Sequence, residues 1–158
     1  MRVAFFAALC VMVLRYGLYA MDRAPEGTSF MLVHLLALVL VIFFSGSAAL
    51  RNDRESGFPL LVRDGFKAAA IYSLLYAVFI WAFFRRIDAT HFPERIGQLV
   101  SLAKAEGQPE ELVRERLELF FTPTNYATMT FFALLAFSAL LALLLGLFHH
   151  RWLRHLRR

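Results

Sequence analysis

Two ionisable side chains, Arg15 and His34, lie inside long apolar stretches of the chain. Such groups are costly at membrane depth and commonly mark ion or substrate pathways, proton relays or internal polar pairs. Arg15 precedes the end of its stretch by five residues, and His34 follows the start of the next by five, which places both roughly 7.5 Å below one boundary. The favoured interpretation is that Arg15 extends along its own stem to the boundary. The alternative is a polar pair across the first two helices, with Asp22, Glu26 or Asp88 available as counter-charge.

Three histidines near the C-terminus, His149, His150 and His155, are the other candidate ligands. Arginines crowd the same ten residues, and no acidic or cysteine side chain is near, so like charge opposes a bound cation. We therefore expect no metal site and no cofactor. The chain also has no Gly-rich phosphate loop, HExxH, GxSxG or CxxC pattern. These absences predict a protein that is not an enzyme.

Long apolar stretches must position these groups. Hydrophobic residues make up 59% of the chain and charged residues 18%, unlike an average soluble domain. A membrane-spanning helix needs about 20 apolar residues, with about 17 as the lower bound. Residues 68–84 only just reach that bound. We predict an all-α, polytopic membrane domain over residues 1–158, with four transmembrane helices at about residues 3–20, 29–50, 66–85 and 125–148.

The first stretch also has features of a signal peptide, because Arg2 precedes an apolar run. Arg15 interrupts that run late, and Tyr19 puts a large residue where a cleavage site needs a small one. We expect a retained transmembrane helix. With four spans, both termini and the 51–67 loop share one side, which carries nine cations against three acids, or +6. The other side carries −2, so the positive-inside rule predicts cytoplasmic termini.

The basic tail, residues 149–158, follows the fourth apolar stretch directly. Basic residues beside a span attract anionic headgroups, each contributing about 1 kcal/mol near the surface. We expect this tail to anchor on anionic lipid. The anchoring residues are Arg151, Trp152, Arg154, Arg157 and Arg158. The excess of basic residues lies on one side of the membrane and does not form a nucleic-acid-binding patch, so we expect no nucleic-acid partner.

Residues 87–124 form a connection too long to be bare in a compact protein. Apolar residues recur there at helical spacing, Thr90 is a candidate cap, Gly107 a stop signal and Pro109 a first-turn residue. We predict an extracytoplasmic amphipathic helical hairpin over about residues 90–121. Its faces could pack on each other, lie on the bilayer or bind a partner. The expected partner face comprises Ile96, Leu99, Val113, Leu117, Phe120 and Phe121.

Small residues mark where membrane helices approach each other closely, because lipid gives helices little hydrophobic drive to associate. Two runs with four-residue spacing occur in the third and fourth apolar stretches. They comprise Ala69, Ser73 and Ala77, and Ser138, Ala142 and Gly146. We expect both runs to be helix-packing seams within the bundle, and such a seam is also a candidate surface for self-association.

Several short motifs resemble a bacterial family of four-span membrane proteins that is catalogued only as a domain of unknown function. They are Gly57-Phe58, the Asp64-Gly65-Phe66-Lys67 opening of the third span, Arg86-Ile87-Asp88 and the stretch from Lys104 to Glu111. The resemblance covers nearly the whole chain, although the first span with Arg15 is the least similar part. It implies a multi-pass protein of the bacterial cytoplasmic (inner) membrane and no established activity. It also ranks a lipid-linked glycosyltransferase among the candidate partners.

These observations favour a non-catalytic accessory or scaffold subunit of the bacterial cell envelope, which acts through helix seams and the hairpin. The alternative is a small oligomeric transporter or channel that uses the level of Arg15 and His34. The absence of a deep acidic residue argues against proton coupling, since such relays generally use Asp or Glu. A third hypothesis is a lipid-modifying enzyme, or a helper of a lipid-linked glycosyltransferase.

Overall fold

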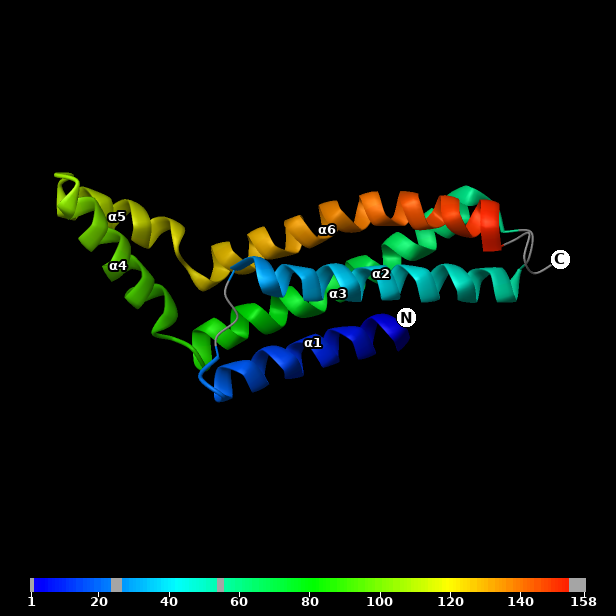
Figure 1. Ribbon diagram of the computed structural model, residues 1–158, viewed down its shortest axis with the longest axis horizontal. Coiled ribbons are helices and arrows are strands. Elements are labelled where there is room, and N and C mark those ends of the chain that lie inside the picture. Colours follow the sequence, from blue (N-terminus) through cyan, green and yellow to red (C-terminus); the bar gives the residue numbers. More distant parts are fainter. Residues whose placement is uncertain (1, 24–26, 54–55, 154–158) are drawn as a thin grey trace. The chain divides into compact units, whose positions relative to one another are not determined.

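The computed structural model describes residues 2–23, 27–53 and 56–153, and every regular element in these ranges is a helix. Figure 1 shows the helices in order along the chain. They are α1 (Arg2–Ala20), α2 (Gly27–Asn52), α3 (Phe58–Arg86), α4 (His91–Ala105), α5 (Glu110–Phe120), α6 (Pro123–Phe148) and the short π-helix η1 (His149–Leu153).

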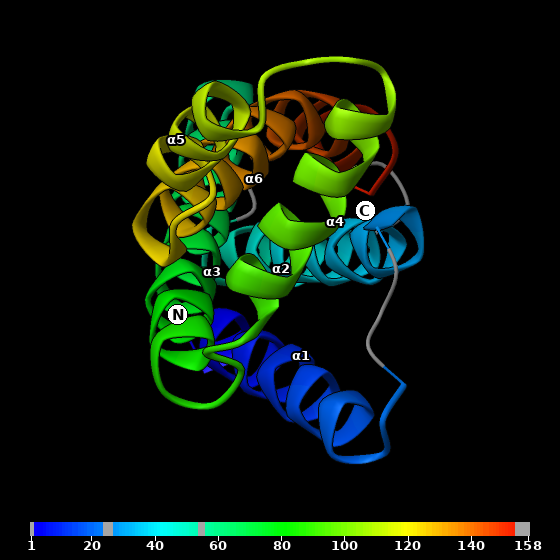
Figure 2. The ribbon, with the colours of Figure 1, turned by 90° about the vertical axis from the view of Figure 1, so that its left-hand side faces the viewer.

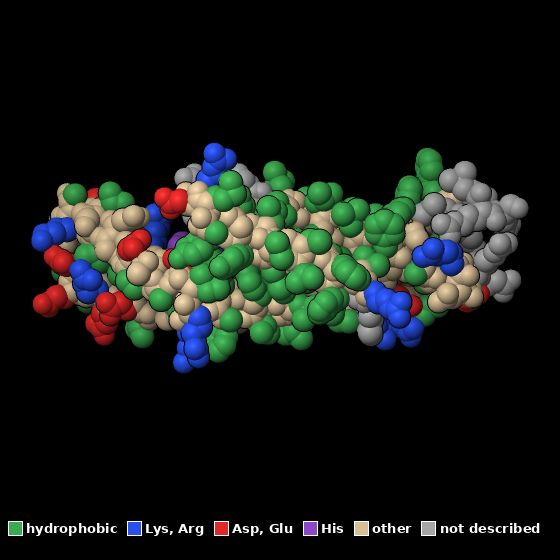
Figure 3. Space-filling model, turned by 90° about the horizontal axis from the view of Figure 1, so that it is seen from below, with side chains coloured by type: hydrophobic (Ala, Val, Ile, Leu, Met, Phe, Trp, Pro, Cys, Tyr) green, Lys and Arg blue, Asp and Glu red, His purple; other side chains and the backbone are tan. Residues whose placement is uncertain are grey.

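Four stretches are long and apolar enough to cross a membrane: Arg2–Ala20, Phe30–Asn52, Phe58–Arg86 and Pro123–Trp152. The predicted all-α fold with four membrane-length helices is therefore confirmed. Large apolar side chains cover their outer faces. Phe6, Val13, Leu32, Leu36, Leu140 and Leu144 are each more than 60% exposed. Figure 3 shows hydrophobic side chains gathered over α1. Contiguous apolar surface of this kind suits lipid and indicates a multi-pass membrane protein.

The third long helix begins at Phe58, well before the expected start near residue 66. The Gly57 carbonyl accepts hydrogen bonds from the backbone N–H groups of Leu60 and Leu61 at 3.1 and 3.2 Å. Pro59 fits in this first turn, where its missing N–H leaves no intrahelical bond unmade. The resulting helix of 29 residues is about 43 Å long, so α3 has ample length to cross a bilayer.

The chain divides into two compact units: unit 1 comprises Met1–Tyr76 and Phe132–Arg158, and unit 2 comprises Ala77–Phe131. In unit 1, α1 packs against α2, and α2, the first part of α3 and the last part of α6 surround the core. Leu38, Val41, Ile42, Tyr72 and Ala142 are each at most 1% exposed there.

Glycines let the helices of unit 1 approach one another closely. A Cβ atom at Gly65 would lie 2.9 Å from Ile42 Cγ2 and 4.0 Å from the Ala142 Cβ. One at Gly146 would lie 2.7 Å from Val62 Cγ2 and 3.5 Å from the Val62 backbone nitrogen. Distances below 3.0 Å are too short for real side chains, so these glycines set the separation of α2, α3 and α6.

Unit 2 contains the end of α3, the hairpin of α4 and α5, and the start of α6. The two hairpin helices pack against each other (Figure 2). Gly107 adopts φ +81°, and the Gln108 N–H donates to the Ala103 carbonyl at 3.0 Å, as in a glycine-terminated helix end. Thr90 takes the N-cap position of α4 but makes no side-chain capping bond.

Replacing Gly146 with Leu is expected to destabilise unit 1, because the new side chain must displace Val62 or move α3 away. Overpacking of this kind costs about 1–3 kcal/mol, which thermal unfolding in detergent would report as a lower Tm. The matched control is Leu144→Ala, since Leu144 is 65% exposed and faces lipid in our account. Equal losses in the two variants would contradict a close contact at Gly146.

Candidate functional site: a buried polar cluster of three helices

Helical spacing brings four polar or aromatic side chains of α2 and α3 together in unit 1. Phe30 and His34 are four residues apart on α2, and Tyr72 and Tyr76 are four apart on α3, so each pair shares one helix face. Side chains of His34, Tyr72 and Tyr76 are 7%, 0% and 2% exposed. Both tyrosines were absent from the expected site, although their four-residue spacing is the signal that could have found them.

His34 and Tyr72 form the central contact of this cluster. The His34 Nδ1 and the Tyr72 hydroxyl share a hydrogen bond of 2.7 Å. The Tyr76 ring lies edge-on to the His34 ring, with centroids 4.2 Å apart, and the Phe30 ring lies 5.1 Å from it. The imidazole is therefore held by a hydroxyl and enclosed by aromatic rings.

Arg15 brings α1 to the same cluster. Its guanidinium carbon lies 5.4 Å from the centre of the Phe30 ring, and the residue is 7% exposed. A cation over an aromatic face gains about 0.5–2 kcal/mol, with the larger value where water is excluded. Of the two interpretations of Arg15, this burial favours the internal polar pair, because a side chain extended along the surface would be exposed.

The cluster joins three helices, and its imidazole and hydroxyl are not open to a substrate. Its hydroxyl and imidazole are bonded to each other, and aromatic rings occupy the space around them. Within the part of the chain that the structure describes, no group of three or more His, Cys, Asp or Glu could hold a metal ion. The geometry supports helix association rather than substrate binding.

A second buried polar contact joins the first residue of η1, directly after α6, to α2. His149 is 1% exposed, and its ring lies 3.0 Å from the position of a Cβ on Gly46. Its Nδ1 lies 2.7 Å from the Leu145 carbonyl oxygen, and its Nε2 lies 2.9 Å from the Phe43 carbonyl oxygen and 3.2 Å from the Ser47 Oγ.

Both ring nitrogens of His149 lie within hydrogen-bond distance of partners, the Leu145 carbonyl at Nδ1 and the Phe43 carbonyl and Ser47 hydroxyl at Nε2. The ring thus acts as a polar clasp between two helices. Sequence reasoning placed this histidine in the tail and missed the clasp.

The expected seam residues are all buried. Ala69, Ser73, Ser138 and Ala142 are each 0% exposed and Ala77 is 8% exposed; Gly146 is also buried. The Ser73 and Ser138 hydroxyls donate to the carbonyls of the residues four before them, at 2.9 and 2.6 Å. Gly65, which packs near Ala142, was not among the expected residues.

Of the expected partner-face residues of the hairpin, only Phe120 is more than half exposed. Ile96 is buried, Leu99, Val113, Leu117 and Phe121 are half-buried, and Phe120 is 53% exposed. Two leucines outside the expected set, Leu112 and Leu119, are 47% and 72% exposed. Their seven-residue spacing puts them on one side of α5, next to Phe120. Helical periodicity missed this side because glutamates and Arg116 lie between the leucines.

At the start of the tail, Arg151 is exposed and Trp152 is 66% exposed. The Trp152 ring stacks on Phe148, with centroids 6.2 Å apart. The other expected anchor residues, Arg154, Arg157 and Arg158, lie outside the described residues. Anchoring on anionic lipid remains a prediction.

These features define an all-helical, multi-pass membrane protein in which His34 and His149 are hydrogen-bonded inside the bundle. The chain belongs to the family described as a protein of unknown function (DUF4199), which matches residues 2–151. The expected membership of a family catalogued only as a domain of unknown function, over nearly the whole chain, is therefore confirmed. No curated protein and no solved structure matches the chain.

Replacing Tyr72 with Phe and His34 with Leu tests whether the two side chains support each other. A double-mutant cycle in detergent unfolding is expected to give a coupling of about 0.6–1.7 kcal/mol, the range for hydrogen bonds between membrane helices. Tyr126→Phe removes the same hydroxyl from a residue that is 40% exposed and should leave the stability nearly unchanged. Additive effects of the two cluster substitutions would contradict a stabilising bond.

Proposed function

We propose that this protein is a non-catalytic accessory or scaffold subunit of the bacterial cell envelope, which holds a protein partner through an apolar stripe on α5. The stripe comprises Leu112, Leu119 and Phe120, which are 47%, 72% and 53% exposed. Leu112 and Leu119 share one helix face, and Phe120 lies about 80–100° around the helix axis from them. Exposed apolar residues grouped in this way, between charged residues, are typical of an interaction surface. This stripe is the observation on which the proposal depends.

The stripe is held in a fixed position within unit 2. The Asn125 side-chain amide at the start of α6 donates to the carbonyls of Leu119 and Phe120 at 2.9 and 3.2 Å. Phe84 of α3 contacts Phe92 of α4 and Tyr126 of α6, with ring centroids 4.9 and 5.1 Å apart. A preorganised surface loses less conformational entropy when a partner binds.

Charge favours a protein partner over the bilayer surface. The hairpin, residues 91–120, carries six Glu and four Lys or Arg, whereas helices that lie on membranes are commonly rich in Lys and Arg on their polar face. An anionic lipid surface would repel this hairpin. The complementary partner is an apolar protein segment flanked by basic residues.

Two ion pairs of Glu110 stabilise the hairpin near its turn. The Lys104 Nζ donates to a Glu110 carboxylate oxygen at 3.0 Å, and Arg114 donates to the other oxygen at 3.4 Å. The hydrogen bond from Lys104 holds the pKa of Glu110 below its usual range. Any contribution of these bonds is therefore retained above the ordinary pKa of a glutamate and is lost as the pH falls through the lowered value.

We further propose that the protein lies in the cytoplasmic (inner) membrane with both termini in the cytoplasm and the hairpin outside. The support is the charge balance of +6 on the terminal side and −2 on the hairpin side. The alternative, a transporter that uses Arg15 and His34, has less support, because aromatic rings enclose these residues and Tyr72.

A photo-crosslinking amino acid at position 119 tests the partner surface in living cells. We expect a discrete adduct whose second component is one protein, identified by mass spectrometry. Leu112→Glu with Phe120→Glu should suppress the adduct, because the charges remove the apolar stripe. The matched control is Gln98→Glu with Gln108→Glu, which adds the same charge at exposed polar positions of the hairpin.

The same experiment has outcomes that contradict the proposal. No protein adduct at position 119, or an adduct that survives the two stripe substitutions, would show that the stripe does not hold a partner. An adduct of twice the chain mass would instead identify a second copy of this protein.

A further inference from the structure

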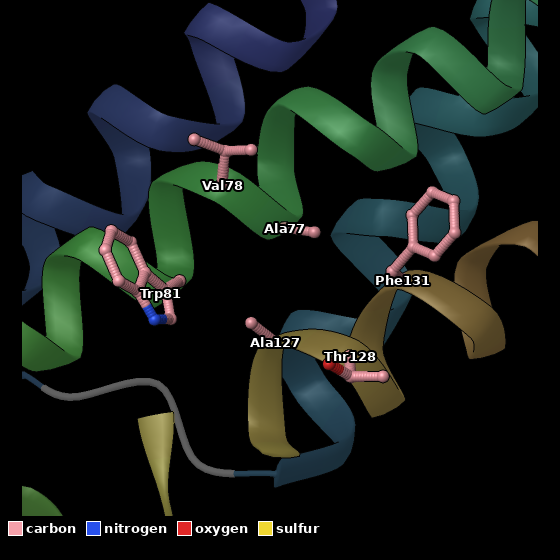
Figure 4. Close-up of a pocket in the computed structure, with 6 residues that line it drawn as sticks. All are labelled: Ala77, Val78, Trp81, Ala127, Thr128 and Phe131. Carbon is pink, nitrogen blue, oxygen red and sulfur yellow. The ribbon is translucent and has the colours of Figure 1, made fainter. Parts of the chain in front are cut away.

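A shallow groove of about 370 Å³ runs between the last part of α3 and the first part of α6, within unit 2. Ala77, Val78 and Trp81 line it from α3, and Ala127, Thr128 and Phe131 line it from α6 (Figure 4). Both stretches belong to the membrane-length helices. The groove therefore opens toward the surroundings of the bundle at membrane depth.

Small residues form the floor of the groove, and large ones form its walls. Ala77 and Ala127 are 8% and 7% exposed, whereas Val78 and Trp81 are 58% and 37% exposed. Thr128 contributes the only hydroxyl of the lining. A surface of this composition suits a flexible hydrocarbon chain and offers no set of polar groups for a water-soluble ligand.

A cation stands at one end of the groove. Ala77, Trp81 and Arg85 follow one another at four-residue spacing on α3, so they lie on one face of that helix. The Arg85 guanidinium carbon lies 5.1 Å from the centre of the Trp81 ring, and Arg85 is exposed. Among the residues that the structure describes, no carboxylate forms an ion pair with Arg85. Its N–H groups are available to an oxyanion.

We propose that this groove binds an anionic phospholipid, with one acyl chain between α3 and α6 and the phosphate on Arg85. The guanidinium fork donates to two phosphate oxygens at once, and the Trp81 ring below it is the amphipathic side chain common at the membrane interface. The apolar floor of the groove thus matches an acyl chain, and the basic residue at its end matches the phosphate of the same lipid molecule.

The size of the groove suits a slender ligand. From Ala77 to Arg85, α3 rises about 12 Å, which is the length over which one acyl chain would lie. The groove volume of about 370 Å³ is at the lower end of the range of roughly 300–1,000 Å³ for ligand sites.

Trp81 supplies the probe for a direct test with the full-length protein. The chain has two tryptophans, so Trp152→Phe leaves Trp81 as the only one. The protein is placed in phosphatidylcholine vesicles that contain, at equal mole fraction, phosphatidylglycerol or phosphatidylcholine with brominated acyl chains. Bromine quenches a nearby tryptophan. We expect the brominated phosphatidylglycerol to compete for the groove about fivefold better, the factor for one cation near an anionic headgroup.

Two variants separate the headgroup contact from the groove itself. Arg85→Gln should abolish the preference for phosphatidylglycerol, whereas Arg95→Gln, the same change at an exposed arginine of α4, should retain it. Ala127→Leu fills the groove and should weaken quenching by both brominated lipids. Because Arg85 is exposed, its substitution leaves the packing of unit 2 intact and keeps the test valid should Ala127→Leu fail to fold.

Three results would overturn the proposal. Equal quenching by the two lipids would show that no headgroup is recognised. A preference that survives Arg85→Gln would place the recognition elsewhere. Weak quenching by every brominated lipid would mean that protein, such as a second copy of the chain, covers the groove.

Discussion

A polar side chain within hydrocarbon must find its hydrogen-bond partner inside the protein, because the bilayer core offers none. The rest of this structure depends on how that requirement is met. His34 bonds to Tyr72 at 2.7 Å, and His149 lies against the carbonyls of Leu145 and Phe43. These two histidine contacts therefore satisfy polar groups and also join helices.

Different contacts hold different pairs of helices together in unit 1. The polar cluster ties α1 and α2 to α3 through Arg15, Phe30, His34 and Tyr72. The His149 clasp ties the start of η1 to α2. Glycines add close packing where no side chain fits, as at Gly146. The recognition surfaces that we propose, the α5 stripe and the groove of unit 2, lie outside these internal contacts.

Several features could be predicted from the sequence because their signals are local or very long. Apolar stretches of membrane length predicted four helices, and Gly107 with Pro109 predicted the hairpin turn. Sequence spacing also placed Arg15 and His34 at one depth. By contrast, the start of α3 at Phe58 was not predicted. Charged residues lie in the first turns of this helix, and a prediction based on uncharged transmembrane stretches leaves such turns out.

Tyr72, Tyr76 and the His149 clasp were not predicted, and the reason is physical. Membrane helices are apolar on every side, so the sequence does not say which face turns inward; α6 is the clearest case. A tyrosine in such a helix is unremarkable until its hydroxyl is seen to meet His34. A glycine such as Gly46 indicates close approach but not its partner, which here is the ring of a histidine about a hundred residues later.

Closure of the polar cluster is tested most directly by its accessibility to water. Cys10 is the only cysteine, so Cys10→Ser gives a background for single cysteines at the buried Leu38 and Ser73 and at the exposed Gln108. With the hairpin outside the membrane, as we propose, a membrane-impermeant thiol reagent on intact cells should label only position 108. Labelling at position 38 or 73 would reveal a water-filled path through the bundle and contradict the account.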